Sequence, residues 1–99
     1  MKLFLGADHG GFKLKETLKQ WLQAQKIEWE DLGNTVFDPV DDFVDFGIKV
    51  AEKVQQGLGK GVLLCRSGGM ALVANKYKGV QSVEVWNEMT ARHAKEHRD

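Results

Sequence analysis

The sequence predicts an α/β fold in which helices cover both faces of a parallel β-sheet. Short apolar runs, such as residues 3–7 and 61–65, are each followed by turn-forming residues and then by apolar residues at helical spacing. Four such strand-and-helix units succeed one another along the 99 residues. Right-handed crossovers between successive units make the strands parallel and distribute the helices over both faces.

The first unit begins with residues 3–7, an apolar run that ends in Asp8, His9 and two glycines. Apolar residues at largely helical spacing follow over residues 12–22. This order predicts a strand, a tight turn and a helix.

The second unit begins with residues 27–32, which predict a strand closed by a turn. Pro39 cannot continue a strand ladder, and apolar positions over residues 43–54 line one face of a helix. Gly57 and Gly59 are expected to end that helix.

The third unit contains residues 61–65, a fully apolar run typical of a strand covered on both faces. Residues 67–69 form a glycine-rich turn, and a helical stretch continues through Asn75. A fourth strand is expected over residues 80–86 and a fourth helix over residues 87–97. The sequence therefore predicts one domain over its whole length, a three-layer Rossmann-like sandwich with four parallel strands.

Ligands of such sheets bind outside the carboxyl ends of the strands. Three loops lie there in the expected fold: residues 8–11, residues 66–69, and the loop that follows Leu32. We expect a functional site to be built from these loops.

Cys65 ends the third apolar run, directly before the glycine-rich turn and a helix start. Glycines allow close approach of the backbone to a ligand, and the N–H groups at a helix start favour an anion. The same positive end favours a reactive thiolate. A base beside an oxyanion site is what proton abstraction next to a carbonyl requires. The alternative, which composition alone favours, is that Cys65 is a small buried apolar residue and the glycines form only a turn.

Asp8 and His9 leave the first strand at the edge of the same expected crevice. A carboxylate and an imidazole there could bind hydroxyl groups or transfer protons near neutral pH. Alternatively, Asp8 is a turn or helix-capping residue.

Composition argues against several classes of partner. Lys and Arg (14) equal Asp and Glu (14), so no strong field attracts nucleic acid or an anionic membrane. No apolar run approaches the roughly 18 residues of a membrane span. Asp8 and His9 interrupt the N-terminal apolar run before it resembles a secretion signal, and the single Cys65 fits a reducing compartment. A cytoplasmic protein is expected.

His93 and His97 lie four residues apart on the last expected helix and hence on one face. They lack the Glu that follows the first His in a zinc-protease motif, and no Cys is near them in sequence. A metal site is therefore not expected.

Several motifs occur in order along the chain: Gly6-Ala7-Asp8-His9-Gly10-Gly11-Phe12-Lys13-Leu14-Lys15, Asp42-Phe43-Val44-Asp45-Phe46, Leu63-Leu64-Cys65, Ser67-Gly68-Gly69-Met70, Ala74-Asn75-Lys76, Ala91-Arg92 and Glu96-His97. With these motifs the chain resembles type B ribose-5-phosphate isomerase and the closely related galactose-6-phosphate isomerase subunits. The resemblance spans residues 1–99.

The resemblance implies an aldose-ketose isomerase that interconverts ribose 5-phosphate and ribulose 5-phosphate through an enediolate. It implies that Cys65 is the base, that Ser67 contacts the reacting end of the sugar, and that His97 assists ring opening. Asp8 and His9 would bind the substrate. It further implies that no metal or organic cofactor is used, and that the active site lies at the interface of a homodimer or higher homo-oligomer.

The sequence departs from the family pattern in the glycine-rich loop, where Arg66 replaces the first glycine and one residue is missing before the following helix. Gly68 and Gly69 remain to form the anion hole, and Arg66 is a candidate for binding the substrate. Arg98, also a candidate, replaces the Asn that usually follows the ring-opening histidine.

Family members also continue for roughly another strand and one or two helices, which supply arginines that bind the substrate phosphate. The chain is therefore expected to lack the fifth strand of the sheet, to bind sugar phosphate weakly and to have little or no isomerase activity by itself. Three accounts stay open: an isomerase, a catalytically silent sugar-phosphate-binding or interaction module, and a fragment of a longer reading frame. The motifs favour family function first, and they do not distinguish a pentose from a hexose phosphate.

Overall fold

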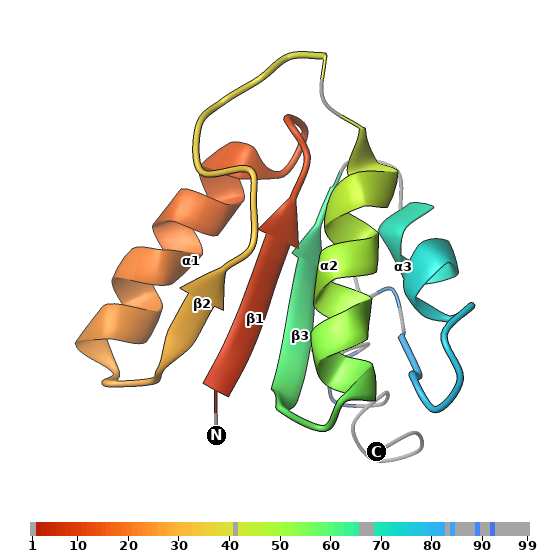
Figure 1. Cartoon of the computed structure of the whole chain (residues 1–99). Helices are drawn as coiled ribbons and strands as arrows, with labels where there is room; N and C mark the ends of the chain where they lie inside the picture. Colours follow the sequence, from red (N-terminus) through yellow and green to blue (C-terminus); the bar gives the residue numbers. More distant parts are fainter. Residues whose placement is uncertain are drawn as a thin grey trace.

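The sheet is parallel and has three strands within the residues that the computed structural model describes, which are 2–40, 42–65, 69–82, 84, 89 and 92. The elements are β1 (Lys2–Ala7), α1 (Phe12–Ala24), β2 (Trp29–Asp31), α2 (Phe43–Gln55), β3 (Gly59–Leu64) and α3 (Gly69–Ala74). Their spatial order in the sheet is β2-β1-β3, with β1 in the centre (Figure 1). The expected α/β class and parallel sheet are confirmed.

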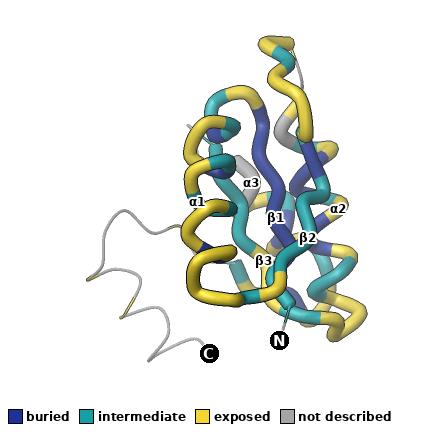
Figure 2. The backbone as a smooth tube through the Cα atoms, turned by 90° about the vertical axis from the view of Figure 1, so that its left-hand side faces the viewer, coloured by how far each residue is buried: buried dark blue, intermediate teal, exposed yellow. Residues whose placement is uncertain are grey.

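The two long helices cover opposite faces of the sheet. Figure 2 shows α1 on one side of the strands and α2 on the other, which is the expected three-layer arrangement. α2 packs on β1 and β3, while α3 packs against α2 beside the edge of β3 (Figure 1). The central strand is the most deeply buried of the three, with Phe4, Leu5 and Ala7 all buried.

α2 approaches the sheet closely because two strands present glycine beneath Val50. A Cβ atom added at Gly6 would lie 2.8 Å from Val50 Cγ2, and one added at Gly61 would lie 2.5 Å from Val50 Cγ1. Val50 is only 2% exposed and lies over these two glycines of adjacent strands. The absence of two side chains therefore forms the hollow that receives α2.

α1 buries a different side from the one its apolar residues suggest. Lys15 and Leu22, seven residues apart, are buried, whereas Leu14 and Trp21 are 60% and 55% exposed. Residues seven apart lie on one side of a helix, so a lysine occupies a position that an apolar residue would usually take.

The end of α2 and the start of β3 partly follow the expectation. Gly57 has φ +75° and ends α2 as predicted. Gly59, expected to end the helix, is instead the first residue of β3 and lies opposite Lys2. A Cβ atom there would lie 2.2 Å from the carbonyl oxygen of Lys2, so the strand pairing itself requires glycine.

The expected fourth strand differs most from the structure. Residues 80–82 and 84 belong to no strand, and the rest of residues 80–86 lies outside the described residues. Val80 instead packs with Ala51 and Ala74. The side chain of Asn75 binds the main chain of Ser82. Asn75 Nδ2 donates to the Ser82 carbonyl (2.8 Å), and Ser82 N donates to Asn75 Oδ1 (2.6 Å). These side-chain bonds take the place of a strand ladder.

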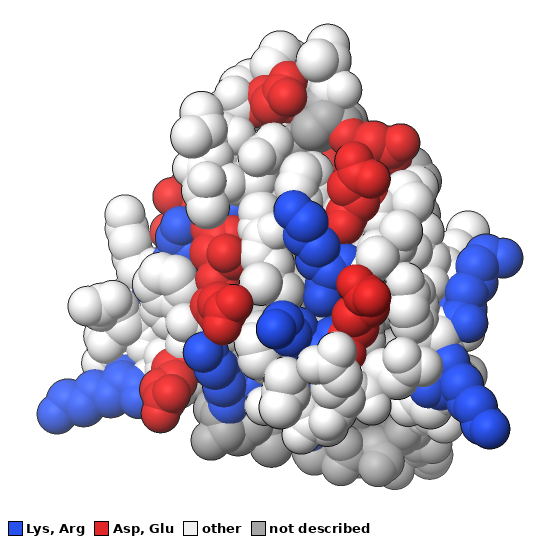
Figure 3. All heavy atoms as spheres, viewed as in Figure 1, with Lys and Arg blue, Asp and Glu red and all other residues white. Residues whose placement is uncertain are grey.

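The described helices and the face of the molecule drawn in Figure 3 bear on the expectations from composition. None of the helices in the described ranges combines the length and apolar character needed to cross a bilayer. Lysines and acidic residues are interspersed on the face drawn in Figure 3.

Candidate functional site

The carboxyl ends of β1 and β3 lie side by side, because Ala7 pairs with Leu64 in the parallel register. Asp8 and Cys65 are the next residues of the two strands, so the structure brings them to the same edge of the sheet. Cys65 is partly buried there. The sequence-based expectation that these two residues belong to one site is therefore supported by the register.

The side chain of Asp8 shapes the loop between β1 and α1. Asp8 is 8% exposed, and its Oδ1 accepts hydrogen bonds from the N–H groups of Gly10 (2.9 Å) and Gly11 (3.2 Å). This is the turn-forming role that the sequence left open as an alternative. His9, the next residue, is exposed at the tip of the loop.

Gly11 fixes how closely this loop approaches β3. A Cβ atom at Gly11 would lie 2.1 Å from the carbonyl oxygen of Leu64, which leaves no space for any side chain. Leu64 directly precedes Cys65. The loop that carries Asp8 and His9 is thus packed against the main chain beside the thiol.

The third expected loop also reaches this edge. After β2 the chain continues to pair with β1: Leu32 N donates to Leu5 O (2.8 Å), Ala7 N donates to Gly33 O (2.8 Å), and Asn34 N donates to Ala7 O (3.0 Å). Residues 33–34 therefore lie beside the last residue of β1.

Of the remaining predicted site residues, the structure places Gly69 alone. Gly69 is the first residue of α3, which is separated along the chain from the loop of Asp8 by α1, β2, α2 and β3. The other candidates lie outside the described residues: Arg66, Ser67, Gly68, His97 and Arg98, together with His93 of the disfavoured metal pair. Within the described part of the chain, no three His, Cys, Asp or Glu side chains are grouped to hold a metal ion.

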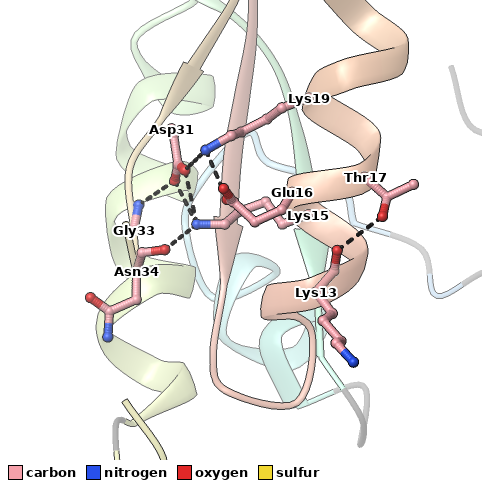
Figure 4. Close-up of polar contacts among 8 residues, drawn as sticks. All are labelled: Lys13, Lys15, Glu16, Thr17, Lys19, Asp31, Gly33 and Asn34. Atoms are coloured by element: carbon pink, nitrogen blue, oxygen red, sulfur yellow. Dashed lines mark hydrogen bonds and ion pairs between the residues drawn. The ribbon is translucent and has the colours of Figure 1, made fainter. Parts of the chain in front are cut away.

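A buried ion network lies next to the site and was not identified from the sequence. Lys15 Nζ donates to both carboxylate oxygens of Asp31, Oδ1 at 2.8 Å and Oδ2 at 2.9 Å, and also to the carbonyl oxygen of Asn34 (Figure 4). Lys19 Nζ donates to Asp31 Oδ2 (2.9 Å) and pairs with Glu16 (2.8 Å). The side chains of Lys15 and Asp31 are 0% and 6% exposed.

The network lowers the pKa of Asp31. Burial acts in the opposite direction, since it disfavours the charged carboxylate, but hydrogen bonds from Lys15, Lys19 and the N–H of Gly33 outweigh it. The pKa of Lys19 is raised: burial alone would lower it, and the bonds to Glu16 and Asp31 dominate. Both groups are therefore held in their charged forms at neutral pH.

The signal for this network can be recognised in the sequence only once the buried side of α1 is known. Lys15 is seven residues before Leu22, on the buried side of its helix, and Asp31 ends the next strand. A lysine on the inner side of a helix requires an anionic partner, and the acidic residue at the end of the following strand is within reach in a strand-helix-strand unit.

The fold is that of an α/β protein with a parallel sheet, a class in which ligands usually bind at the carboxyl edge of the sheet. Residues 3–99 match the Ribose/Galactose Isomerase family, and the chain belongs to this family. The resemblance inferred from the motifs is confirmed.

The relatives include proteins named for one activity. The chain is 39% identical over 98 residues to a Mycoplasma genitalium protein named probable ribose-5-phosphate isomerase B, a match that covers 96% of this chain and 64% of that protein. The chain thus spans slightly less than two thirds of the length of this relative.

Two solved structures resemble the chain closely. Ribose-5-phosphate isomerase B of Clostridium thermocellum has a TM-score of 0.94 at 37% identity, covering 100% of this chain and 68% of that structure. Ribose-5-phosphate isomerase B of Mycoplasma genitalium, solved with bound ribulose-5-phosphate, has a TM-score of 0.91 at 37% identity, covering 97% of this chain and 65% of that structure.

Proposed function

We propose that this chain carries the proton-transfer part of an aldose-ketose isomerase that interconverts ribose 5-phosphate and ribulose 5-phosphate. The observation that carries the proposal is the register of β1 and β3, which places Cys65 beside the loop of Asp8 and His9 at the carboxyl edge of the sheet. The ribulose-5-phosphate bound in the Mycoplasma genitalium relative supports the class of substrate.

In the proposed reaction the Cys65 thiolate removes the proton from C2 of the open-chain aldose. The electron pair left behind forms the enediolate, in which the O2 hydroxyl proton passes to O1. The same thiol returns the carbon-bound proton at C1 to give the ketose, so no oxidant or reductant is consumed. Ser67, Gly68 and Gly69 would stabilise the negative oxygen, and His97 would assist ring opening. These roles are carried over from the family motifs.

Phosphate binding would fall to three basic side chains. His9 is exposed at the tip of the loop after β1, and Arg66 directly follows Cys65 in the chain. Arg98 is the third candidate. A guanidinium group suits a phosphate because its planar fork matches two oxygens.

A coupled assay for ribulose 5-phosphate tests the proposal. In the full-length or active form, Cys65→Ser should lower turnover by orders of magnitude, because a neutral hydroxyl is a far weaker base than a thiolate, while the circular dichroism spectrum stays unchanged. Lys2→Ala, at the opposite end of β1, is the matched control and should leave turnover intact. Equal turnover of Cys65→Ser and the unsubstituted chain would rule out Cys65 as the base.

The geometry of Asp8 favours a second candidate, a silent sugar-phosphate-binding module. Asp8 is nearly buried, and one carboxylate oxygen is already bonded to two main-chain N–H groups, as expected for a structural residue. Protection of Cys65 from alkylation by ribose 5-phosphate, without turnover in the coupled assay, would identify this module.

We also propose that the chain forms a homodimer or a higher homo-oligomer. Leu14 and Trp21 are more than half exposed and lie seven residues apart on one side of α1. Exposed apolar side chains grouped on a helix are normally covered by a partner. Light scattering at micromolar concentration tests this, and a strictly monomeric chain would contradict it.

A further inference from the structure

Lys15 is completely buried, and its charge has no evident benefit for stability alone. Its exposed fraction is 0%, the same as that of Leu5 and Ala7 in the apolar core. Removing an ammonium group from water is costly, and apolar side chains of similar volume often stabilise such a position equally well. The reason for a lysine here must therefore be sought in the bonds that it makes.

All three donors of the Lys15 ammonium group are used. Two reach the carboxylate of Asp31 at the end of β2, and the third reaches the carbonyl oxygen of Asn34, three residues further along (Figure 4). Asp31 in turn accepts from the N–H of Gly33 (2.9 Å). Lys15 and Asp31 thus bind the main chain that follows β2 at two points, the N–H of Gly33 and the carbonyl oxygen of Asn34.

This held segment lies against the predicted site. Gly33 O accepts from Ala7 N, and Asn34 N donates to Ala7 O. Ala7 is the last residue of β1 and directly precedes Asp8. Any shift of residues 33–34 is therefore transmitted to the start of the loop that carries Asp8 and His9.

The main chain of Lys15 also contacts the other end of that loop. Lys15 N donates to Gly11 O (3.0 Å), and Gly11 is packed against the end of β3. One residue thus connects two segments of the site, the loop 8–11 through its backbone and the segment 33–34 through its side chain.

An aromatic contact reinforces the same connection. The rings of Phe12 and Phe37 are 5.8 Å apart and nearly perpendicular, at 77°. Lys15 Nζ lies 5.2 Å from the centroid of the Phe12 ring. The segment 33–37 is therefore fixed to the start of α1 at two points.

We infer that Lys15 is a positioning residue of the sugar-phosphate site. It holds residues 33–37 in a fixed position beside the loop 8–11. In this way it sets the position of Asp8 and His9, and it does not contact the substrate itself. Asp31 is its anchor on β2. The inference rests on the proposed function for the identity of the ligand, whereas the positioning itself does not depend on any ligand.

Amide hydrogen exchange of the Lys15→Met variant tests the positioning directly. The Ala7 and Asn34 amides should exchange roughly tenfold faster than in the unsubstituted chain, the effect expected from one lost charge-assisted hydrogen bond. Amides of α2, on the other face of the sheet, should keep their rates. Lys19→Met is the matched control, since Lys19 also binds Asp31 and its other partner is Glu16 on its own helix; it should leave both amides unchanged.

Three results would overturn the positioning role: unchanged exchange in Lys15→Met, an equal acceleration of all amides, or the same local acceleration in Lys19→Met. If Lys15→Met does not fold, Lys15→Met/Asp31→Met replaces the pair by apolar side chains and should show the same local acceleration. Failure of both variants to fold would show that the pair is needed for the whole fold, and the inference would be wrong.

A titration with ribose 5-phosphate connects the positioning to the site. The Kd of Lys15→Met should rise at least about tenfold, whereas that of Lys19→Met should stay the same. An unchanged Kd together with faster local exchange would show that the segment is not part of the site. Absence of binding by the unsubstituted chain would contradict the proposed function instead, and the exchange pattern would still decide whether Lys15 positions the segment.

Discussion

The two faces of the sheet hold their helices by different means. On one face, α2 is held by apolar packing, with Val50 received by the hollow over Gly6 and Gly61. On the other face, α1 buries Leu22 but also Lys15, whose ammonium group is bonded to Asp31. The apolar contact is non-directional and favours stability, whereas the ion pair is directional and favours one geometry. The directional contact is made by α1, the helix that directly follows the loop of Asp8.

Breaking the ion pair from the side of Asp31 should have the largest effect. Asp31→Asn leaves the Lys15 charge buried without an anion, and we expect a loss of about 3 kcal/mol in the free energy of unfolding. Lys15→Met should cost only about 1 kcal/mol, because Asp31 keeps its bond to Lys19. Urea denaturation of both variants measures this asymmetry, and equal losses would contradict it.

The apolar face can be tested with a pair of complementary substitutions. Gly61→Ala should destabilise the chain by about 2 kcal/mol, because the new Cβ atom would lie 2.5 Å from Val50 Cγ1. Val50→Ala alone should also destabilise it, by about 2 kcal/mol, through the lost methyl groups. Together the two should cost less than their sum, since the smaller side chain relieves the overlap. Additive losses in a double-mutant cycle would show that Val50 does not occupy the space left by the missing side chain of Gly61.

The ion pair also predicts a pH dependence that the apolar face lacks. The folded pKa of Asp31 lies below its ordinary value of 3.8, so its contribution is fully present above that value and is lost as the pH falls through the lower folded pKa. Acid unfolding of the chain should therefore become less steep in Asp31→Asn. Val50→Ala is the control and should shift the whole stability curve without changing its slope with pH.

The smallest effect is expected at the exposed ion pair between Lys2 and Glu30, where the side chains are 40% and 42% exposed. Lys2→Ala should change the free energy of unfolding by less than about 1 kcal/mol, because water screens such pairs. A larger loss would show that the contribution of an ion pair to the free energy of unfolding does not depend on its burial in this fold.

The positions of two candidate site residues could be predicted from the sequence because both directly follow strands. Asp8 and Cys65 come after apolar runs, and the carboxyl ends of parallel strands meet at one edge. Lys15 could not be assigned in this way, because its partners Asp31 and Asn34 are 16 and 19 residues away in the chain. Only the packing of α1 on the sheet brings them together.

The sequence by itself determined the order of the first three strands and helices through local periodicity, and the family through its motifs. The tertiary structure decided which side of α1 faces the sheet: Lys15 and Leu22 are buried, and Leu14 and Trp21 are not. It also decided that the main chain of Ser82 is hydrogen-bonded to the side chain of Asn75 and that residues 80–82 are not part of a strand. The physical reason is that periodicity reports only that a helix or strand has an apolar side, whereas the neighbours that satisfy a buried charge or an unpaired backbone group are distant in sequence.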